Sequence, residues 1–138
     1  MEMKGTNGKI GGGGFHHLAF KAKDFDMSYE FYTEGLGFKP TISWGEGDSR
    51  AVMLDSGDGG CIELFAGGSS EPLPAGVYMH VAFNTDDCDL AVENARKAGA
   101  EVTMEPKDIA IQSNPVTNVR IGFCKGPDGE ILEFFQKK

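Results

Sequence analysis

Several short stretches of the chain alternate between apolar and polar residues, which is the period of a β-strand with one buried face. These stretches are "HLAF" from His17, "CIELF" from Cys61, "HVAF" from His80 and "ILEFF" from Ile131. An amphipathic segment follows each stretch that begins with histidine. The pattern predicts one helix from about Asp26 to Gly35 and a second from Cys88 to Ala98.

The same order of elements occurs twice. "HLAFKAKDFDMSYEFY" from His17 aligns with "HVAFNTDDCDLAVENA" from His80 at a constant offset of 63 residues. Both halves continue with strand-like stretches and end in a turn followed by an alternating run, "CIELF" or "ILEFF". Repetition of a whole supersecondary unit is strong evidence for a duplicated architecture. We therefore predict an α+β fold of two tandem βαβββ modules.

The predicted modules occupy most of the chain. A length of 138 residues fits one domain, which we place over residues 15–138. Module one is expected over about 15–66 and module two over about 77–136. A linker rich in Gly, Ser and Pro separates them at about 67–76, and residues 1–14 form a flexible glycine-rich lead.

Composition excludes several classes of function. The net charge of −8, without a cluster of basic residues, argues against nucleic acids and anionic membrane surfaces as partners. No apolar run approaches the roughly 18 residues that a membrane span needs. Three cysteines without CxxC spacing, in a chain with no signal-peptide pattern, indicate reduced thiols and a cytoplasmic location.

Four ionisable residues are expected on the sheet faces that the helices leave open. Alternation turns the large apolar residues of each strand towards its helix, and therefore directs His17, Glu63, His80 and Glu133 to the opposite side. A lone strand histidine or glutamate is ordinarily structural or solvent-facing. Matching positions in an internal repeat favour a shared role, and two imidazoles with two carboxylates suit Ni, Co, Zn, Fe or Mn. His16 is expected on the other face, in a structural role or in support of a ligand.

The chain resembles the vicinal-oxygen-chelate superfamily, which includes glyoxalases, bleomycin-resistance proteins and extradiol dioxygenases. The resemblance lies in "HHLAFKAKDFDMSYEFYTEGLGFK", "CIELF", "HVAFNTDDCDLAVENARKAGAEV" and "GFCKGPDGEILEFF". It implies paired βαβββ modules whose mixed sheets form a cup around one metal site. It also implies a homodimer, in which each cup is sometimes built from two chains.

Within the superfamily the order His–Glu–His–Glu resembles glyoxalase I. The resemblance implies that His17, Glu63, His80 and Glu133 bind one divalent ion, Ni²⁺, Co²⁺ or Zn²⁺. It implies that Glu133 is the base, with Glu63 opposite it. The implied reaction turns the hemithioacetal of a thiol and a 2-oxoaldehyde, such as methylglyoxal, into a thioester through an enediolate.

The contacts to the thiol resemble the family less well. Glutathione-using members carry an arginine where this chain has Lys21, and an asparagine where it has Ala66-Gly67. A lysine holds a carboxylate as a point charge, without the two-pronged geometry of arginine. The co-substrate is therefore glutathione or another thiol.

Other residues are expected around the substrate. Cys61 and Phe65 share a face with Glu63, and Phe135 shares one with Glu133; core packing is the alternative for both aromatic rings. Cys61 as a nucleophile is a weak hypothesis, because no base is placed beside it. Residues 106–120 are expected to form a rim loop or lid, with Arg120 holding an anionic substrate or forming a surface ion pair.

Two alternatives to a glyoxalase I-like lyase or isomerase remain open. One is an epimerase or related enzyme acting on another chelating substrate. Methylmalonyl-CoA epimerase resembles this pattern but usually carries glutamine at the position of Glu63. The other is a metal-free protein that binds a drug or metabolite, for which a complete ligand set would be unusual.

Overall fold

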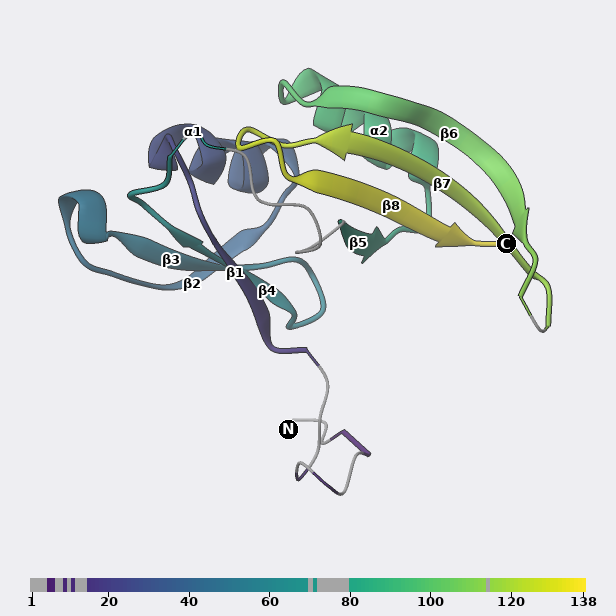
Figure 1. Ribbon diagram of the computed structural model, residues 1–138, viewed down its shortest axis with the longest axis horizontal. Coiled ribbons are helices and arrows are strands. Elements are labelled where there is room, and N and C mark those ends of the chain that lie inside the picture. Colours follow the sequence, from purple (N-terminus) through teal and green to yellow (C-terminus); the bar gives the residue numbers. More distant parts are fainter. Residues whose placement is uncertain are drawn as a thin grey trace.

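Two four-stranded sheets, each with a helix against one face, make up the described part of the chain (Figure 1). The computed structural model describes residues 5–6, 9, 11, 15–69, 71, 80–113 and 115–138. The first module contains β1 (His17–Lys21), α1 (Phe25–Glu30), the π-helix η2 (Phe31–Gly35), β2 (Lys39–Trp44), the 3-10 helix η3 (Gly47–Ser49), β3 (Ala51–Asp55) and β4 (Cys61–Phe65). The second contains β5 (Val81–Asn84), α2 (Cys88–Lys97), β6 (Glu101–Ile111), β7 (Thr117–Lys125) and β8 (Ile131–Lys137).

The two sheets have the same topology, which confirms the predicted βαβββ modules. Their strand orders are β1-β4-β3-β2 and β5-β8-β7-β6. The first strand of each module pairs in parallel with the last, and the remaining pairs are antiparallel. The first strand of each module, β1 or β5, therefore lies at one edge of its sheet. The proposed lead and linker lie mostly outside the described residues and stay predictions.

Equivalent aspartates start the two main helices. Asp24 accepts a hydrogen bond from the backbone N–H of Met27 at 3.0 Å, and Asp87 accepts one from Leu90 at 3.0 Å. Such caps satisfy backbone donors that have no partner inside the helix. Because the two aspartates are 63 residues apart, the repeat extends to the caps. Within the described residues, no helix is long and apolar enough to cross a membrane.

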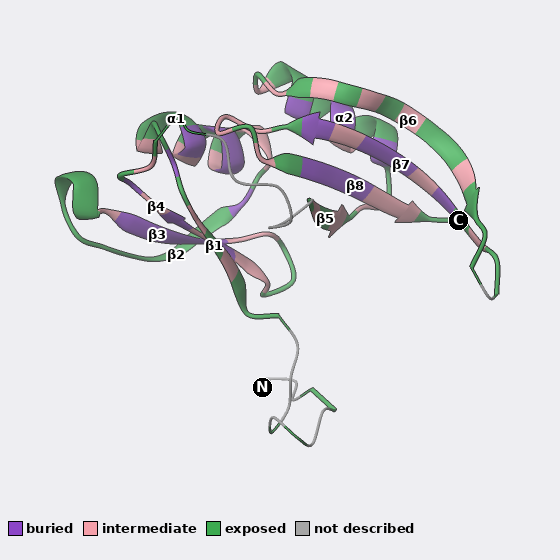
Figure 2. Cartoon of the chain, in the orientation of Figure 1, coloured by how far each residue is buried: buried purple, intermediate pink, exposed green. Residues whose placement is uncertain are grey.

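The segment 106–120 is not a loop, so this expectation is wrong. Strands β6 and β7 pair over most of it and form a long hairpin, whose last pair is Ile111 with Thr117. The segment is polar because β6 is an edge strand whose side chains are largely exposed (Figure 2). Edge strands carry more polar residues than central strands, which makes them resemble loops in sequence.

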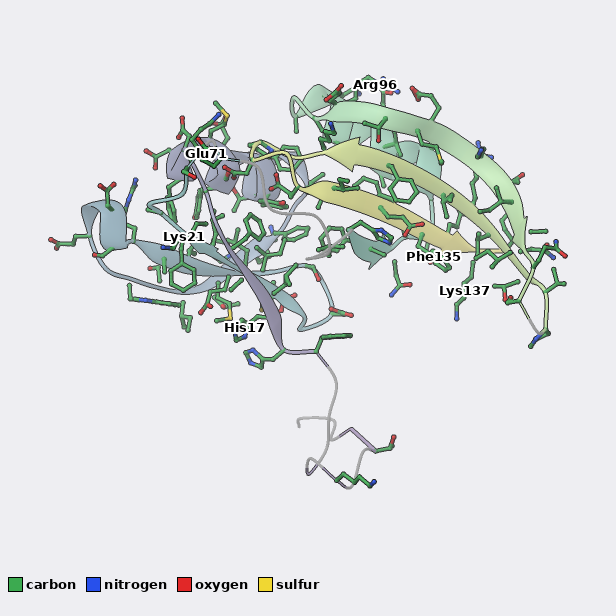
Figure 3. The ribbon with its side chains drawn as sticks, viewed as in Figure 1. His17, Lys21, Glu71, Arg96, Phe135 and Lys137 are labelled. Atoms are coloured by element: carbon green, nitrogen blue, oxygen red, sulfur yellow. The ribbon has the colours of Figure 1, made fainter. Side chains whose placement is uncertain are left out.

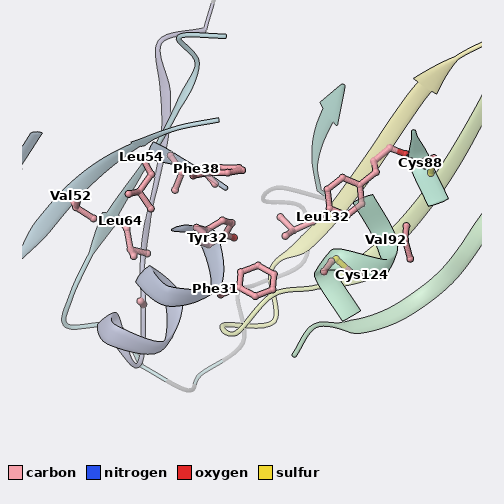
Figure 4. Packing of buried hydrophobic residues seen from close by; sticks show 14 residues of the cluster. Phe31, Tyr32, Phe38, Val52, Leu54, Leu64, Cys88, Val92, Cys124 and Leu132 are labelled. Atoms are coloured by element: carbon pink, nitrogen blue, oxygen red, sulfur yellow. Dashed lines mark hydrogen bonds between the residues drawn. The ribbon is translucent and has the colours of Figure 1, made fainter. Parts of the chain in front are cut away.

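The modules share one hydrophobic core on their helix side (Figure 4). Phe38 contacts Phe83 of the second module edge-on, with ring centroids 5.3 Å apart. A side chain on Gly35 would place its Cβ 2.5 Å from that of Ala98, so glycine allows η2 to approach α2 closely. This packing fixes how the two sheets are placed relative to each other.

Hydrogen bonds also cross the junction. The hydroxyl of Tyr32, which is fully buried, donates to Glu130 at 2.7 Å. Asp128 accepts from the Ser28 hydroxyl at 2.8 Å and from the backbone N–H of Lys23 at 2.6 Å. Burial raises the pKa of the Glu130 carboxyl and, together with that carboxyl, raises the pKa of Tyr32. The phenol therefore stays protonated and acts as the donor.

Removing this donor tests the junction. Tyr32→Phe is expected to lower the free energy of unfolding by about 1–3 kcal/mol, because it removes the donor to Oε2 of the partly buried Glu130 carboxylate, whose Oε1 keeps the backbone N–H of Asp128. Urea unfolding would measure the change. Tyr29→Phe is the matched control, since that hydroxyl makes no hydrogen bond among the described residues, and its effect should stay within about 0.5 kcal/mol. Equal effects of the two variants would contradict a structural role for the Tyr32 hydroxyl.

Candidate metal centre

The first pair of candidate ligands lies on β1 and β4. His17 begins β1 opposite Cys61, and Glu63 lies opposite Ala19 in the same parallel ladder. Neighbours across a ladder share a face, so His17 and Glu63 both lie on the side of the sheet away from α1. Nε2 of His17 is 3.5 Å from Oε1 of Glu63, and the exposed fractions of their side chains are 37% and 15%.

The second pair repeats this geometry on the other sheet. His80 lies one residue before β5, and Glu133 is opposite Ala82 on β8. Nε2 of His80 is 3.1 Å from Oε1 of Glu133, with side-chain exposed fractions of 36% and 10%. The two halves of the chain therefore present the same two donor atoms with closely similar exposure.

The structure brings the four predicted ligands together as two pairs and not as one group of four. In the part of the chain that the structure describes, which includes all four, no three or more His, Cys, Asp or Glu residues are close enough to hold one ion. His17 on β1 lies on a different sheet from Phe135 on β8 (Figure 3). Glu133 is on the same strand as Phe135. Each sheet of a single chain therefore carries one half-site.

Each half-site has the donor spacing that a divalent ion requires. Imidazole nitrogen and carboxylate oxygen bind zinc at about 2.0–2.2 Å, so neighbouring ligands in tetrahedral or octahedral geometry lie roughly 3.0–3.5 Å apart. The measured separations of 3.5 and 3.1 Å match this range. Two imidazoles with two carboxylates would also balance the charge of a divalent ion. The residues present therefore fit such an ion when the half-sites are combined.

Apolar side chains surround the carboxylate of the second half-site. Phe123 is the direct cross-strand neighbour of Glu133, and Met104 pairs with Phe123 on the next strand. The His80 ring meets Phe123 edge-on, with centroids 5.5 Å apart. Phe135, predicted to line the pocket, is half-buried on the same face as Glu133. These residues make an apolar wall beside one carboxylate.

The first half-site also has apolar neighbours, with one exposed lysine on the same face. Met53 lies opposite Glu63, and Phe65 meets Trp44 edge-on, with centroids 6.1 Å apart. Lys21 pairs with Phe65 at the end of β1 and is exposed on the face of His17. Lys21 forms no ion pair with any described residue, which leaves its ammonium group available to an anionic ligand.

Arg120 lies on the opposite face from Glu133. Its guanidinium donates to Asp89 on α2 at 2.7 and 2.9 Å and to Asp108 on β6 at 3.2 Å. Hydrogen bonding to these two carboxylates raises the pKa of Arg120 above its usual range and lowers that of Asp89. Arg120 forms the surface ion pair that was the alternative to substrate binding, and we leave it out of the proposed site.

Cys61 lies beside His17 in the ladder, on the candidate face. Partial burial raises the pKa of its thiol, and the nearby Asp55 and Asp58 raise it further. A raised pKa leaves little thiolate at neutral pH, so nothing in this environment activates Cys61 as a nucleophile. Its position is that of a lining residue.

A comparison with protein-family models identifies the lineage. Residues 14–134 match the model of the glyoxalase/bleomycin resistance protein/dioxygenase superfamily, which covers both sheets. The chain belongs to this superfamily. Its membership agrees with the paired βαβββ modules and with the likeness to glyoxalases among solved structures.

Relatives of this superfamily span nearly the whole chain. The chain is 34% identical over 125 residues to YwbC of Bacillus subtilis, an alignment covering 88% of this chain and 95% of that protein. It is 30% identical over 131 residues to "Probable lactoylglutathione lyase" of Vibrio cholerae, covering 88% and 89%. The structure of the trypanothione-dependent glyoxalase I of Leishmania major superposes with a TM-score of 0.66 at 26% identity, covering 88% and 85%.

Sequence reasoning missed Phe123 beside the candidate ligands and left the role of His16 open. Phe123 was not predicted, because the strand containing it was taken in part for a loop and its face could not be assigned. His16 was expected on the other face, in a structural role or in support of a ligand, and its Nδ1 is 2.9 Å from Nδ1 of His17. The repeated-histidine dipeptide was the available signal, but strand alternation assigns His16 to the other face.

Proposed function

We propose that the chain is a metal-dependent isomerase of the glyoxalase I type, which converts the hemithioacetal of a 2-oxoaldehyde and a thiol into a thioester. The observation that carries this proposal is the matched pair of His–Glu half-sites on the helix-free faces of the two sheets. Relatives named as lactoylglutathione lyases support the same reaction class.

The proposal requires two copies of the chain. A half-site offers two donors, whereas a catalytic centre that keeps open positions for substrate typically uses three or four protein ligands. In a two-fold dimer, the His17–Glu63 pair of one copy would face the His80–Glu133 pair of the other, and symmetry would create two such centres. Strand β1, which begins with His17, and strand β5, which follows His80, are edge strands in the described sheets and are therefore available for this approach.

The proposed residues divide the work between ligation and proton transfer. His17, Glu63, His80 and Glu133 would hold one divalent ion per centre, which would supply the positive charge that stabilises negative charge on the substrate oxygens. Glu133 takes the proton from the substrate carbon that carries sulfur and returns it to the adjacent carbon. The hydroxyl proton moves to the neighbouring oxygen, so the reaction is an isomerisation without an external oxidant.

The surroundings favour Glu133 over Glu63 as the base. The Glu133 side chain is 10% exposed and faces the aromatic ring of Phe123, whereas the Glu63 side chain is 15% exposed and faces Met53. Exclusion of water strengthens the interaction between a carboxylate and a nearby reacting group. This difference supports the assignment of the proton transfer to module two.

Metal removal tests the proposed function. Protein stripped with a chelator is expected to lose isomerase activity with methylglyoxal hemithioacetals and to regain it with Ni²⁺, Co²⁺ or Zn²⁺, at one ion per chain. Thioester formation followed by ultraviolet absorbance would measure the activity with glutathione and with other thiols, because Lys21 replaces the family's arginine.

The same stripped protein distinguishes the alternatives. Turnover of methylmalonyl-CoA without turnover of any hemithioacetal would contradict the glyoxalase assignment and favour an epimerase. Ligand binding that does not depend on metal, with no tight metal site, would contradict metal-dependent catalysis altogether and favour a binding protein.

A further inference from the structure

The imidazoles of His16 and His17 form a direct side-chain contact. Their Nδ1 atoms are 2.9 Å apart, and the rings are nearly perpendicular at 86°. At this distance one Nδ1 carries a proton and the other accepts it. The contact therefore occupies the nitrogen of His17 that lies away from Glu63.

This contact determines which nitrogen of His17 remains free. Nε2 of His17 is the atom directed towards Glu63, at 3.5 Å, and it forms no hydrogen bond among the described residues. A neutral imidazole can bind a metal only through its unprotonated nitrogen. If Nδ1 of His17 donates to Nδ1 of His16, the lone pair of Nε2 is directed to the half-site.

The second module lacks an equivalent of this contact. The residue aligned with His16 is Met79, which lies outside the described residues and has no nitrogen that could accept this proton. His80 makes no hydrogen bond through Nδ1 in the described part of the chain, and its ring is held by Phe123 instead. The histidine pair is therefore not a requirement of the repeated strand, and it belongs to the first half-site alone.

We propose that His16 is a positioning residue, which accepts the Nδ1 proton of His17 and so holds the Nε2 lone pair towards the metal centre. Groups that hydrogen-bond to a ligating histidine fix its tautomer and ring orientation. The part of this inference that concerns metal affinity rests on the proposed function. The part that concerns the tautomer of His17 does not rest on the proposed function, because the contact between His16 and His17 lies within one chain and involves no metal.

Two replacements of His16 test the role of its acceptor atom. His16→Asn places Oδ1 near the position of Nδ1 and keeps an acceptor, whereas His16→Phe keeps a ring and removes it. His16 is exposed, so both variants should melt at the wild-type temperature. Metal-free full-length protein would be studied by long-range ¹H–¹⁵N NMR, which assigns the protonated nitrogen of His17. Titration with Zn²⁺ and Ni²⁺ would give the dissociation constants.

The wild type and His16→Asn are expected to show His17 protonated at Nδ1, and His16→Phe to show a shift towards the Nε2–H form. His16→Phe should weaken metal binding by about 10–100-fold, and His16→Asn should restore most of it. An unchanged His17 tautomer in His16→Phe would overturn the inference, as would equal loss of affinity in both variants. A tautomer shift without any tight metal site in the wild type would leave His16 as the positioning residue and contradict the proposed function alone.

Discussion

Replacing Glu133 by glutamine is expected to lower kcat by about 10²–10⁴-fold, which is the usual contribution of a general base. Glutamine keeps an oxygen donor and nearly the same volume but cannot accept the substrate proton. Steady-state rates with a saturating hemithioacetal would measure the loss, and metal content determined on the same sample would show that the ion is retained.

Glu63→Gln is the matched control, since it makes the same chemical change in the other half-site. We expect Glu63→Gln to retain most of kcat, because it leaves the proposed base, Glu133 beside Phe123, unchanged. A Glu133→Gln variant with full metal and full turnover would rule out Glu133 as the base. The reverse order of the two variants would transfer that role to Glu63.

Removing one histidine from either half-site is expected to abolish tight metal binding. His17→Ala and His80→Ala should each weaken Zn²⁺ or Ni²⁺ binding by at least about 100-fold, since loss of a direct ligand costs no less than loss of a supporting group. Titration of metal-stripped protein would give the dissociation constants.

Arg120→Ala provides the control for this pair of variants. Arg120 is close to the second half-site in sequence, but its ion pairs with Asp89 and Asp108 place it on the helix side. Its removal should leave metal affinity unchanged, because exposed ion pairs contribute little even to stability. Loss of metal affinity in Arg120→Ala would contradict the placement of Arg120 on the helix side of the sheet. Unchanged metal affinity in His80→Ala would contradict the role of His80 as a ligand.

The modules could be predicted because their signals are local and repeated. Strand alternation depends on neighbouring residues, and the 63-residue offset between His17 and His80 confirmed each assignment with a second copy. The equivalent helix caps, Asp24 and Asp87, follow the same offset. The same alternation predicted that His17, Glu63, His80 and Glu133 lie on the helix-free faces, but not that they form two separate pairs.

The relation between the half-sites could not be predicted in this way. It depends on how the modules pack, through the Phe38–Phe83 contact, the close approach of Gly35 to Ala98 and the hydrogen bond from Tyr32 to Glu130. None of these contacts has a periodic signal in the sequence. Alternation assigns faces within a sheet but does not predict whether the open faces of two sheets in one chain point towards each other.

The face of Arg120 was unpredictable for a different reason. Alternation assigns a face only when the strand and its register are known, and β7, which contains Arg120, was taken in part for a loop. The register between β6 and β7 also shifts twice, between Val102 and Met104 and between Met104 and Lys107. Each bulge changes which residues of β6 face the same side, so counting along the sequence could not assign a face to Asp108, which binds Arg120.

The central claim is that two copies of the chain combine their half-sites into one metal centre. Two differently tagged chains test it most directly: one carries His17→Ala and Glu63→Ala, and the other carries His80→Ala and Glu133→Ala. Each alone should bind no metal tightly and show no isomerase activity.

The two chains would be co-expressed, and the mixed dimer isolated through both tags. One of its two centres would then contain four intact ligands and the other none. The account predicts one tightly bound ion per mixed dimer and about half of the wild-type activity. A mixed dimer as empty and inactive as either parent, or the failure of any mixed dimer to form, would contradict the shared centre.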